Sequence, residues 1–384
     1  MTSRAFPSRA LRLTPSLFAP GLALALLASC GEPGAPELPP LPDGALEAVD
    51  TEPGVPREDL ARAVDALFTA EDIGETRAVI VMHGGRIVAE RYAEGFDEDT
   101  RFIGWSMSKS VTAVLIGMMV ADGRLALDNA PPIDQWRRAG DPRGEITLRQ
   151  LLQMRSGLRH QEGAEPVYTS SEVRMMYLDG RDDMAAWAEA QPLDHAPGAV
   201  FRYSTATSVI LGDVLARLLA PEGDADARQQ AVAQFLDARL VVPLGLQTMR
   251  AEYDAAGTML AGSAVWANAR DWARFGDFLR NGGAARGVQV VPRGWIDFMK
   301  SESPRAPDYG AQIWLNRPSG TERDYLLAGK APDSAFAALG HGGQVLFVSP
   351  TQKLTVVRLG KGSDEQQRAM LDTLAELVAL YPER

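Results

Sequence analysis

The chain has few residues of the kinds that bind metals or form disulfides. Its 384 residues include one cysteine and four histidines. A single cysteine excludes an intramolecular disulfide, and His83, His160, His195 and His341 do not follow the spacing of metal ligands. A glycine-rich phosphate-binding loop is also missing. We therefore expect neither a metal site nor a cofactor.

Positive charge is scarce as well. Lys and Arg number 39 against 50 Asp and Glu, which gives a net charge of −11. No local cluster of basic residues offsets this balance. The charge therefore argues against a nucleic-acid partner.

Long hydrophobic runs are lacking too, and the apolar stretch "LFAPGLALALLASC" is too short to span a bilayer as a stable helix. It follows Arg4, Arg9 and Arg12 and ends in small residues, which is typical of a secretory signal. Cys30 stands at its end, in "LASC", which resembles a bacterial lipobox. We expect residues 1–30 to be a signal peptide with a lipobox, whose Cys30 receives lipid; the alternative is an ordinary signal with a stray cysteine.

The segment after the predicted signal reads as a linker. Residues 31–57 are dense in proline and acidic side chains, with little to bury, and predict an extended tether. Residues 58–384 then have the composition and patterning of a folded domain. The mature protein is expected to be exported and to face the periplasm or the exterior, with the lipid anchor as its only membrane contact.

Strand patterns lie near both ends of the folded part and helical patterns in the middle. Two β-rich runs flank a turn at residues 83–86, and strands return near 309–315, 334–340, 344–350 and 353–360. Helical patterns fill about 106–300, and amphipathic helices are expected near 58–68 and 364–381. This order predicts an α+β fold: an antiparallel sheet from both chain ends, flanked by helices, beside a helical lobe.

The stretch "GWSMSKS" places Ser106 and Lys109 three residues apart. On a helix such residues share a face. A serine is a weak nucleophile that needs a neighbouring base, and a lysine can serve if burial lowers its pKa. The helix that follows, 111–120, is apolar on every side and is expected to be buried. The simpler alternative is a chance Ser-x-x-Lys in which Ser106 only begins the helix.

Two further motifs accompany it: Tyr203-Ser204-Thr205, before a helix, and His341-Gly342-Gly343, before a strand. The three motifs in this order, with strands at both ends, resemble the serine β-lactamase and penicillin-recognising superfamily. The chain is most similar to its class C and esterase branch, within it to the 6-aminohexanoate-dimer hydrolase group. The resemblance covers the chain from Glu58 to the C-terminus.

The resemblance implies a mechanism. Ser106 would be the acylated nucleophile, and Lys109 and Tyr203 would share general-base and general-acid work. The backbone N–H groups of Ser106 and Gln344 would form the oxyanion hole. Gly342 would let a substrate lie close against the strand edge, as would Gly343.

Departures from the family pattern bear on the substrate. Thr205 stands where an asparagine usually binds the substrate amide, and His341 stands where a lysine usually attracts a carboxylate. Both changes favour small esters or linear amides over β-lactams. Tyr168 is either a lid over the pocket, as in the amide hydrolases, or a surface tyrosine.

Other functions remain to be weighed. A β-lactamase or D-Ala-D-Ala carboxypeptidase-like enzyme would use the same machinery, and a non-catalytic binding protein could keep the fold. An α/β-hydrolase is a weaker alternative, because "GWSMS" lacks the second glycine of the nucleophile elbow and would leave Lys109 unexplained.

Overall fold

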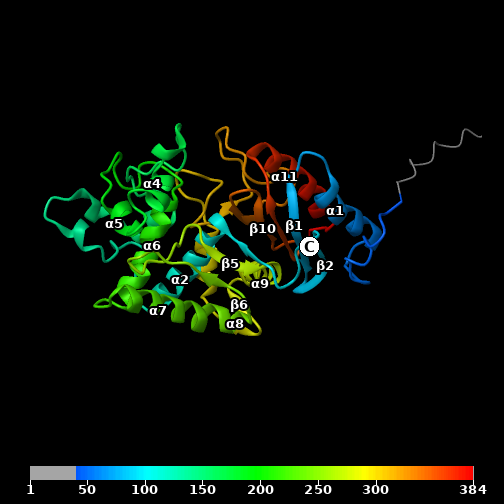
Figure 1. Ribbon diagram of the computed structural model, residues 1–384, viewed down its shortest axis with the longest axis horizontal. Helices are drawn as coiled ribbons and strands as arrows, with labels where there is room; N and C mark the ends of the chain where they lie inside the picture. Colours follow the sequence, from blue (N-terminus) through cyan, green and yellow to red (C-terminus); the bar gives the residue numbers. More distant parts are fainter. Residues whose placement is uncertain (1–39, 384) are drawn as a thin grey trace, which may run out of the picture. The chain divides into compact units, whose positions relative to one another are not determined.

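The computed structural model describes residues 40–383 (Figure 1). The expected signal peptide, Cys30 and the first part of the expected tether lie outside the described residues. Within residues 40–383, no helix combines the length and the apolar character needed to cross a bilayer.

The central element is a six-stranded sheet in the described part of the chain, with strand order β2-β1-β11-β10-β9-β8 and antiparallel neighbours throughout. Its strands are β1 (Glu75–His83), β2 (Arg86–Tyr92), β8 (Trp314–Leu315), β9 (Phe336–Gly340), β10 (Gln344–Ser349) and β11 (Leu354–Lys361). The pairing of β1 with β11, for example Ile80 with Val357, joins the two ends of the folded chain. The predicted α+β fold is confirmed.

Helices cover both faces of the sheet. On one face lie α1 (Arg57–Thr69) and α11 (Asp364–Ala379), which contact each other (Figure 1). On the other lies α9 (Ala269–Arg280). Strand side chains alternate between the two cores, so Val79 packs with α1 and α11 whereas Ile80 packs on the opposite side.

The predicted helical lobe includes one helix that belongs to the sheet. Residues 106–300 are predicted to form that lobe, but α9, which lies within this range, packs on β1, β10 and β11. Gly276 allows this approach, because a Cβ there would lie 2.5 Å from Leu346 and 2.7 Å from Thr355. The helix therefore belongs to the layer that covers the sheet.

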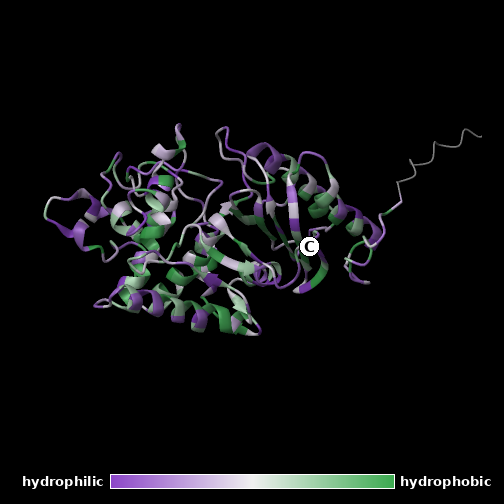
Figure 2. Cartoon of the chain, in the orientation of Figure 1, coloured by the Kyte–Doolittle hydropathy of each residue, from purple (hydrophilic) through white to green (hydrophobic). Residues whose placement is uncertain are grey.

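The helical lobe is built around α2 (Ser108–Ala121) and α6 (Thr205–Leu219), which pack together and are buried along most of their length. Around them lie α3 (Leu148–Leu152), α4 (Ser171–Tyr177), α5 (Met184–Glu189), α7 (Ala225–Leu236), α8 (Val242–Leu244) and α10 (Arg293–Met299). Hydrophilic and hydrophobic residues alternate around α7, as expected of a surface helix (Figure 2).

Short elements complete the lobe. Single helical turns lie at Trp105–Met107, Asp134–Arg137, Pro142–Glu145, Val167–Thr169 and Asp237–Val241. Small sheets are formed by β3 (Arg101–Ile103), β5 (Val265–Asn268) and β4 (Arg250–Ala251), and by β6 (Ala284–Ala285) with β7 (Val288–Gln289).

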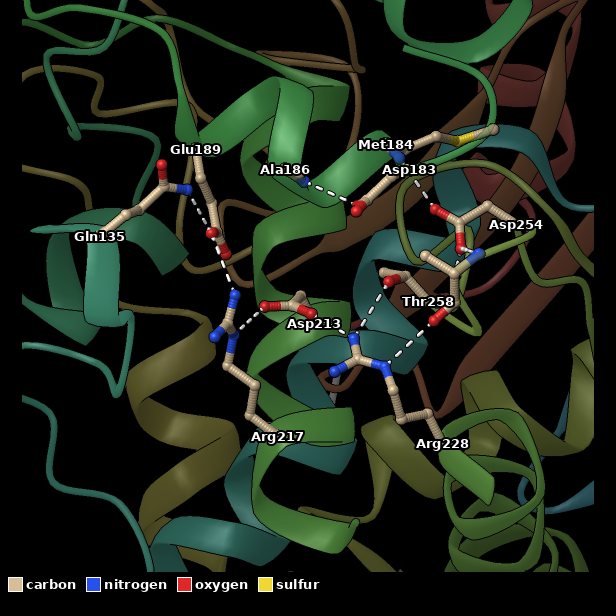
Figure 3. A network of polar contacts seen from close by, with 11 residues as sticks. Gln135, Asp183, Met184, Ala186, Glu189, Asp213, Arg217, Arg228, Asp254 and Thr258 are labelled. Carbon is tan, nitrogen blue, oxygen red and sulfur yellow. Dashed lines mark hydrogen bonds and ion pairs between the residues drawn. The ribbon is translucent and has the colours of Figure 1, made fainter. Parts of the chain in front are cut away.

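A buried polar network ties the helices together (Figure 3). Asp213 of α6, which is almost fully buried, pairs with Arg217 and with Arg228 of α7. Arg217 also pairs with Glu189 of α5 at 3.2 Å. These ion pairs fix α5 and α7 on α6, whose first residues reach the candidate site.

The predicted tether is wrong in its last part. The compact unit begins at Leu41 rather than at residue 58. Val49 forms a β-bridge with Ala89 of the edge strand β2, and the side chains of Val49 and Ala45 are buried. The guanidinium of Arg57 donates to the carbonyl oxygen of Val49 at 3.0 Å. The segment thus covers an edge strand that would otherwise expose unpaired backbone groups.

Candidate active site

Ser106 lies in a single helical turn, Trp105–Met107, directly before α2. Trp105 has a left-handed backbone (φ 46°), which is strained for a bulky residue, and such strain gathers at functional sites. Ser106 borders a cavity of about 610 Å³. The residues that line it include Glu162, Glu172, Tyr203, Trp314, Arg323, Tyr325, His341 and Asp364.

Lys109 stands in the first turn of α2, with its side chain 1% exposed. Its Nζ lies 2.9 Å from Ser106 Oγ. Burial lowers the pKa of Lys109 to about 8, although the carboxylates of Glu162 and Glu172 oppose this shift. A substantial fraction of the amine is therefore neutral near physiological pH and able to accept a proton.

Tyr203 is held by aromatic packing. Its ring stacks on Trp314, with centroids 5.3 Å apart, and Lys109 Nζ lies 4.9 Å from the ring centroid. Burial raises the pKa of Tyr203 well above 10, and a hydrogen bond with Ser106 only partly offsets this effect. The phenol is therefore protonated at neutral pH and can donate a proton close to Ser106.

Substrate binding by Thr205, as predicted, would require its hydroxyl to face the cavity. The structure does not place it there, because Thr205 is not among the residues that line the cavity. It is the first residue of α6 and is 1% exposed. Its Oγ1 accepts a hydrogen bond from Lys109 Nζ at 2.8 Å and donates one to Glu162 at 2.5 Å. Sequence reasoning missed Glu162, because it lies in a loop with no motif around it.

The turn between β9 and β10 brings His341 to the site. Gly340, the last residue of β9, lies against the backbone of Gly104: a Cβ on Gly340 would come within 2.3 Å of the carbonyl oxygen of Gly104. The end of β9 therefore adjoins the turn that holds Ser106. The imidazole of His341 packs edge-on against Trp105, with centroids 5.6 Å apart. His341 lines the cavity that holds Ser106 and also borders a neighbouring cavity.

The next residues of the turn point elsewhere. Gln344 is buried, and its amide nitrogen donates to the carbonyl oxygens of His341 and Gly360. Gln344 and Gly342 line a neighbouring cavity of about 420 Å³ rather than the one that holds Ser106. Gly343 has φ 83°, and its carbonyl oxygen accepts from the buried Arg358. The structure therefore does not bring Gln344, Gly342 or Gly343 into the cavity with Ser106.

Tyr168 is 60% exposed, in the turn Val167–Thr169, and does not line the cavity. This placement agrees with the surface alternative for this residue. Tyr325 borders the cavity instead, edge-on to Trp314 at 4.7 Å. The loop that carries Tyr325 has no pattern from which sequence reasoning could have found it.

The cavity is acidic. Glu162, Glu172 and Asp364 line it, whereas its one arginine, Arg323, is paired with Asp308 at 2.6 Å. Burial, reinforced by Glu162, raises the pKa of Glu172 to about 7. Among residues 40–383, no three His, Cys, Asp or Glu side chains gather closely enough to hold a metal ion.

Comparison with known proteins agrees with this arrangement. The Beta-lactamase family model matches residues 64–380. The chain belongs to the β-lactamase family. A 6-aminohexanoate-dimer hydrolase of Paenarthrobacter ureafaciens is 26% identical over 351 residues, which cover 85% of this chain and 84% of that protein. Esterase EstB of Burkholderia gladioli is 32% identical over 213 residues, 49% of this chain and 50% of that protein.

The fold is that of the β-lactamases and transpeptidases. The structure of EstCE1, described as a hydrolase with promiscuous acyltransferase activity, superposes with a TM-score of 0.62 at 18% identity. The match covers 84% of this chain and 98% of that one. The two relatives named above, a 6-aminohexanoate-dimer hydrolase and an esterase, are hydrolases of the serine β-lactamase superfamily.

Proposed function

We propose that the protein is a serine hydrolase that acts through an acyl-enzyme on small esters or linear amides. The observation that carries this proposal is the 2.9 Å separation of Ser106 Oγ from the buried amine of Lys109, in a cavity also lined by Tyr203. A nucleophile, a base and a proton donor within reach of one another are what acyl transfer requires.

In the first step the neutral amine of Lys109 takes the proton of Ser106 while Oγ forms a bond to the substrate carbonyl carbon. The protonated Tyr203 then gives its proton to the leaving oxygen or nitrogen as that bond breaks, and regains a proton from Lys109. Water attacks the acyl-enzyme in the second step, with the proton transfers reversed. Each positioned proton transfer typically contributes ~10²- to 10⁴-fold in rate.

The oxyanion would bind two backbone N–H groups. One is that of Ser106, at the start of a helix, where the dipole favours negative charge. For the other we propose His341 in place of Gln344, because His341 borders the cavity with Ser106 and Gln344 does not.

The charge of the cavity favours neutral or cationic substrates. A β-lactam or a peptide ending in D-alanine carries a carboxylate, which Glu162, Glu172 and Asp364 would repel. The arginine that lines the cavity, Arg323, is already paired with Asp308 and is not free to compensate. This supports esters or linear amides over the β-lactamase and carboxypeptidase alternatives, and the intact catalytic set argues against a purely binding role.

The cellular location is a separate proposal that rests on the sequence of the first 30 residues. We propose export and lipid attachment at Cys30. Labelling of cells with a fatty acid should mark the wild-type protein and leave Cys30→Ala unmarked.

Pre-steady-state kinetics test the enzymatic proposal. Hydrolysis of a 4-nitrophenyl ester should show a burst of nitrophenol followed by a slower steady state. Ser106→Ala should abolish both phases, whereas Ser334→Ala, on an exposed serine, should leave them unchanged. Full turnover by a folded Ser106→Ala protein would refute the proposal.

A further inference from the structure

The amine of Lys109 has three polar neighbours. They are Ser106 Oγ at 2.9 Å, Thr205 Oγ1 at 2.8 Å and the carbonyl oxygen of Gly262 at 2.8 Å. A carbonyl oxygen can only accept a hydrogen bond. One N–H of Lys109 is therefore committed to Gly262.

The hydroxyl of Thr205 is committed by Glu162. Its hydrogen is donated to one carboxylate oxygen of Glu162 at 2.5 Å, while the backbone N–H of Thr205 donates to the other at 2.6 Å. An ionised carboxylate is an acceptor only. Toward Lys109, Thr205 Oγ1 can therefore act only as an acceptor, and a second N–H of the amine is fixed.

A neutral amine has two N–H groups and one lone pair. With both N–H groups directed at Gly262 and Thr205, the lone pair is left for the third neighbour, Ser106. We infer that Glu162 is a positioning residue: through Thr205 it fixes the direction of the hydrogen bonds so that the Lys109 lone pair faces Ser106. The inference rests on the proposed function, because a lone pair directed at Ser106 matters only if Lys109 is the base.

Removal of the carboxylate should have two separable effects. In Glu162→Gln the amide can donate to Thr205, whose own hydrogen is then free to occupy the lone pair of Lys109. The charge effect is distinct. Glu162 from its loop and Glu172 from α4 both raise the pKa of Lys109 against the effect of burial, and the remaining neighbour, Tyr203, is a neutral phenol at this pH. Loss of one negative charge lowers that pKa.

The test is the acylation burst of the full-length protein with 4-nitrophenyl acetate, followed between about pH 5 and 10. In Glu162→Gln we expect the plateau rate to fall about tenfold and the acidic limb of the profile to move to lower pH. Glu165→Gln, an exposed glutamate of the same loop, is the matched control and should show neither effect. Thr205→Val should lower the plateau rate by a similar factor, whereas Thr205→Ser, which keeps the hydroxyl, should keep the wild-type rate.

Each outcome decides the inference. A Glu162→Gln protein with the wild-type plateau rate overturns it, whether or not the acidic limb has moved, because the lone pair is then directed without Glu162. A slower protein whose limb has not moved also overturns it, because that result indicates a structural role alone. If Glu162→Gln does not fold, Thr205→Val decides: acylation at the wild-type rate overturns the inference. A wild-type protein that shows no burst, and whose Ser106 is not labelled by a fluorophosphonate, rejects the proposed function itself.

Discussion

The amine of Lys109 lies 2.9 Å from the hydroxyl of Ser106 and is almost completely shielded from water. Burial lowers the pKa of this amine to about 8, so the neutral form that can act as a base is reached at a lower pH than for an exposed lysine. The charged form dominates below that pH and the neutral form above it.

The first prediction follows from the lowered pKa of Lys109. Because only neutral Lys109 can take the proton of Ser106, kcat/KM should rise with pH through about 8 and then level off. Lys109→Arg, which stays protonated, should lower kcat/KM by ~10²- to 10⁴-fold. A profile that is flat across this range, or an active Lys109→Arg protein, would contradict the role of Lys109.

A second prediction concerns the hydroxyl of Tyr203. Tyr203→Phe keeps the ring stacked on Trp314 but removes the proton donor, so kcat/KM, which reports the acylation step, should fall by ~10²- to 10⁴-fold for alkyl esters and amides. The loss should be smaller for nitrophenyl esters, whose leaving group needs no proton. Tyr309→Phe is the matched control, because its buried hydroxyl has no hydrogen-bond partner among the described residues. Equal losses for both ester types would argue against Tyr203 as the acid.

A third prediction concerns selectivity for charge. Glu172→Gln should raise kcat/KM for a nitrophenyl ester with a carboxylate on its acyl chain, relative to the uncharged ester, by roughly two- to tenfold. Both esters need the same base, so any change in the pKa of Lys109 cancels in the ratio of their kcat/KM values. Since the pKa of Glu172 is raised to about 7, the difference should grow as pH rises through that value and the wild-type carboxylate ionises. A ratio that Glu172→Gln leaves unchanged at every pH would show that the carboxylate does not meet the substrate.

A fourth prediction concerns stability. The guanidinium of Arg358, 1% exposed, donates to Thr76 Oγ1 and to the carbonyl oxygens of Gly343 and Glu75, and so ties the turn that carries His341 to β1. Arg358→Met leaves these buried acceptors without a donor and should lower the free energy of unfolding by about 2–5 kcal/mol. Urea denaturation measures this loss, and Arg368→Met, on the exposed side of α11, should change it by less than about 0.5 kcal/mol.

Residues of the candidate site that are close in sequence can be placed together from the sequence alone. Ser106 and Lys109 lie three residues apart, in a single turn and the start of the helix that directly follows it, so their spacing alone places them together. The all-apolar run after them indicates a buried helix, and burial is what lowers the pKa of Lys109. The β-rich runs near the two ends of the folded part likewise predict the antiparallel sheet.

The remaining features depend on contacts between distant segments. Glu162 meets Thr205 only after two loops are folded against each other, and Tyr325 reaches the cavity from a loop without periodicity. The choice between His341 and Gln344 depends on where β9 ends. His341, directly after β9, borders both cavities, whereas Gln344, three residues further along the turn, borders only the one without Ser106. Residues 41–56 look unstructured by composition but belong to the compact unit, because they cover an edge strand.

The most direct test of the central claim is to locate a covalent label. The full-length protein would be treated with a fluorophosphonate and digested, and the modified peptide identified by mass spectrometry. The account predicts modification of Ser106, slower labelling of Lys109→Arg, and no label and no ester turnover in Ser106→Ala. A label on another serine, together with turnover that survives in Ser106→Ala, would contradict it.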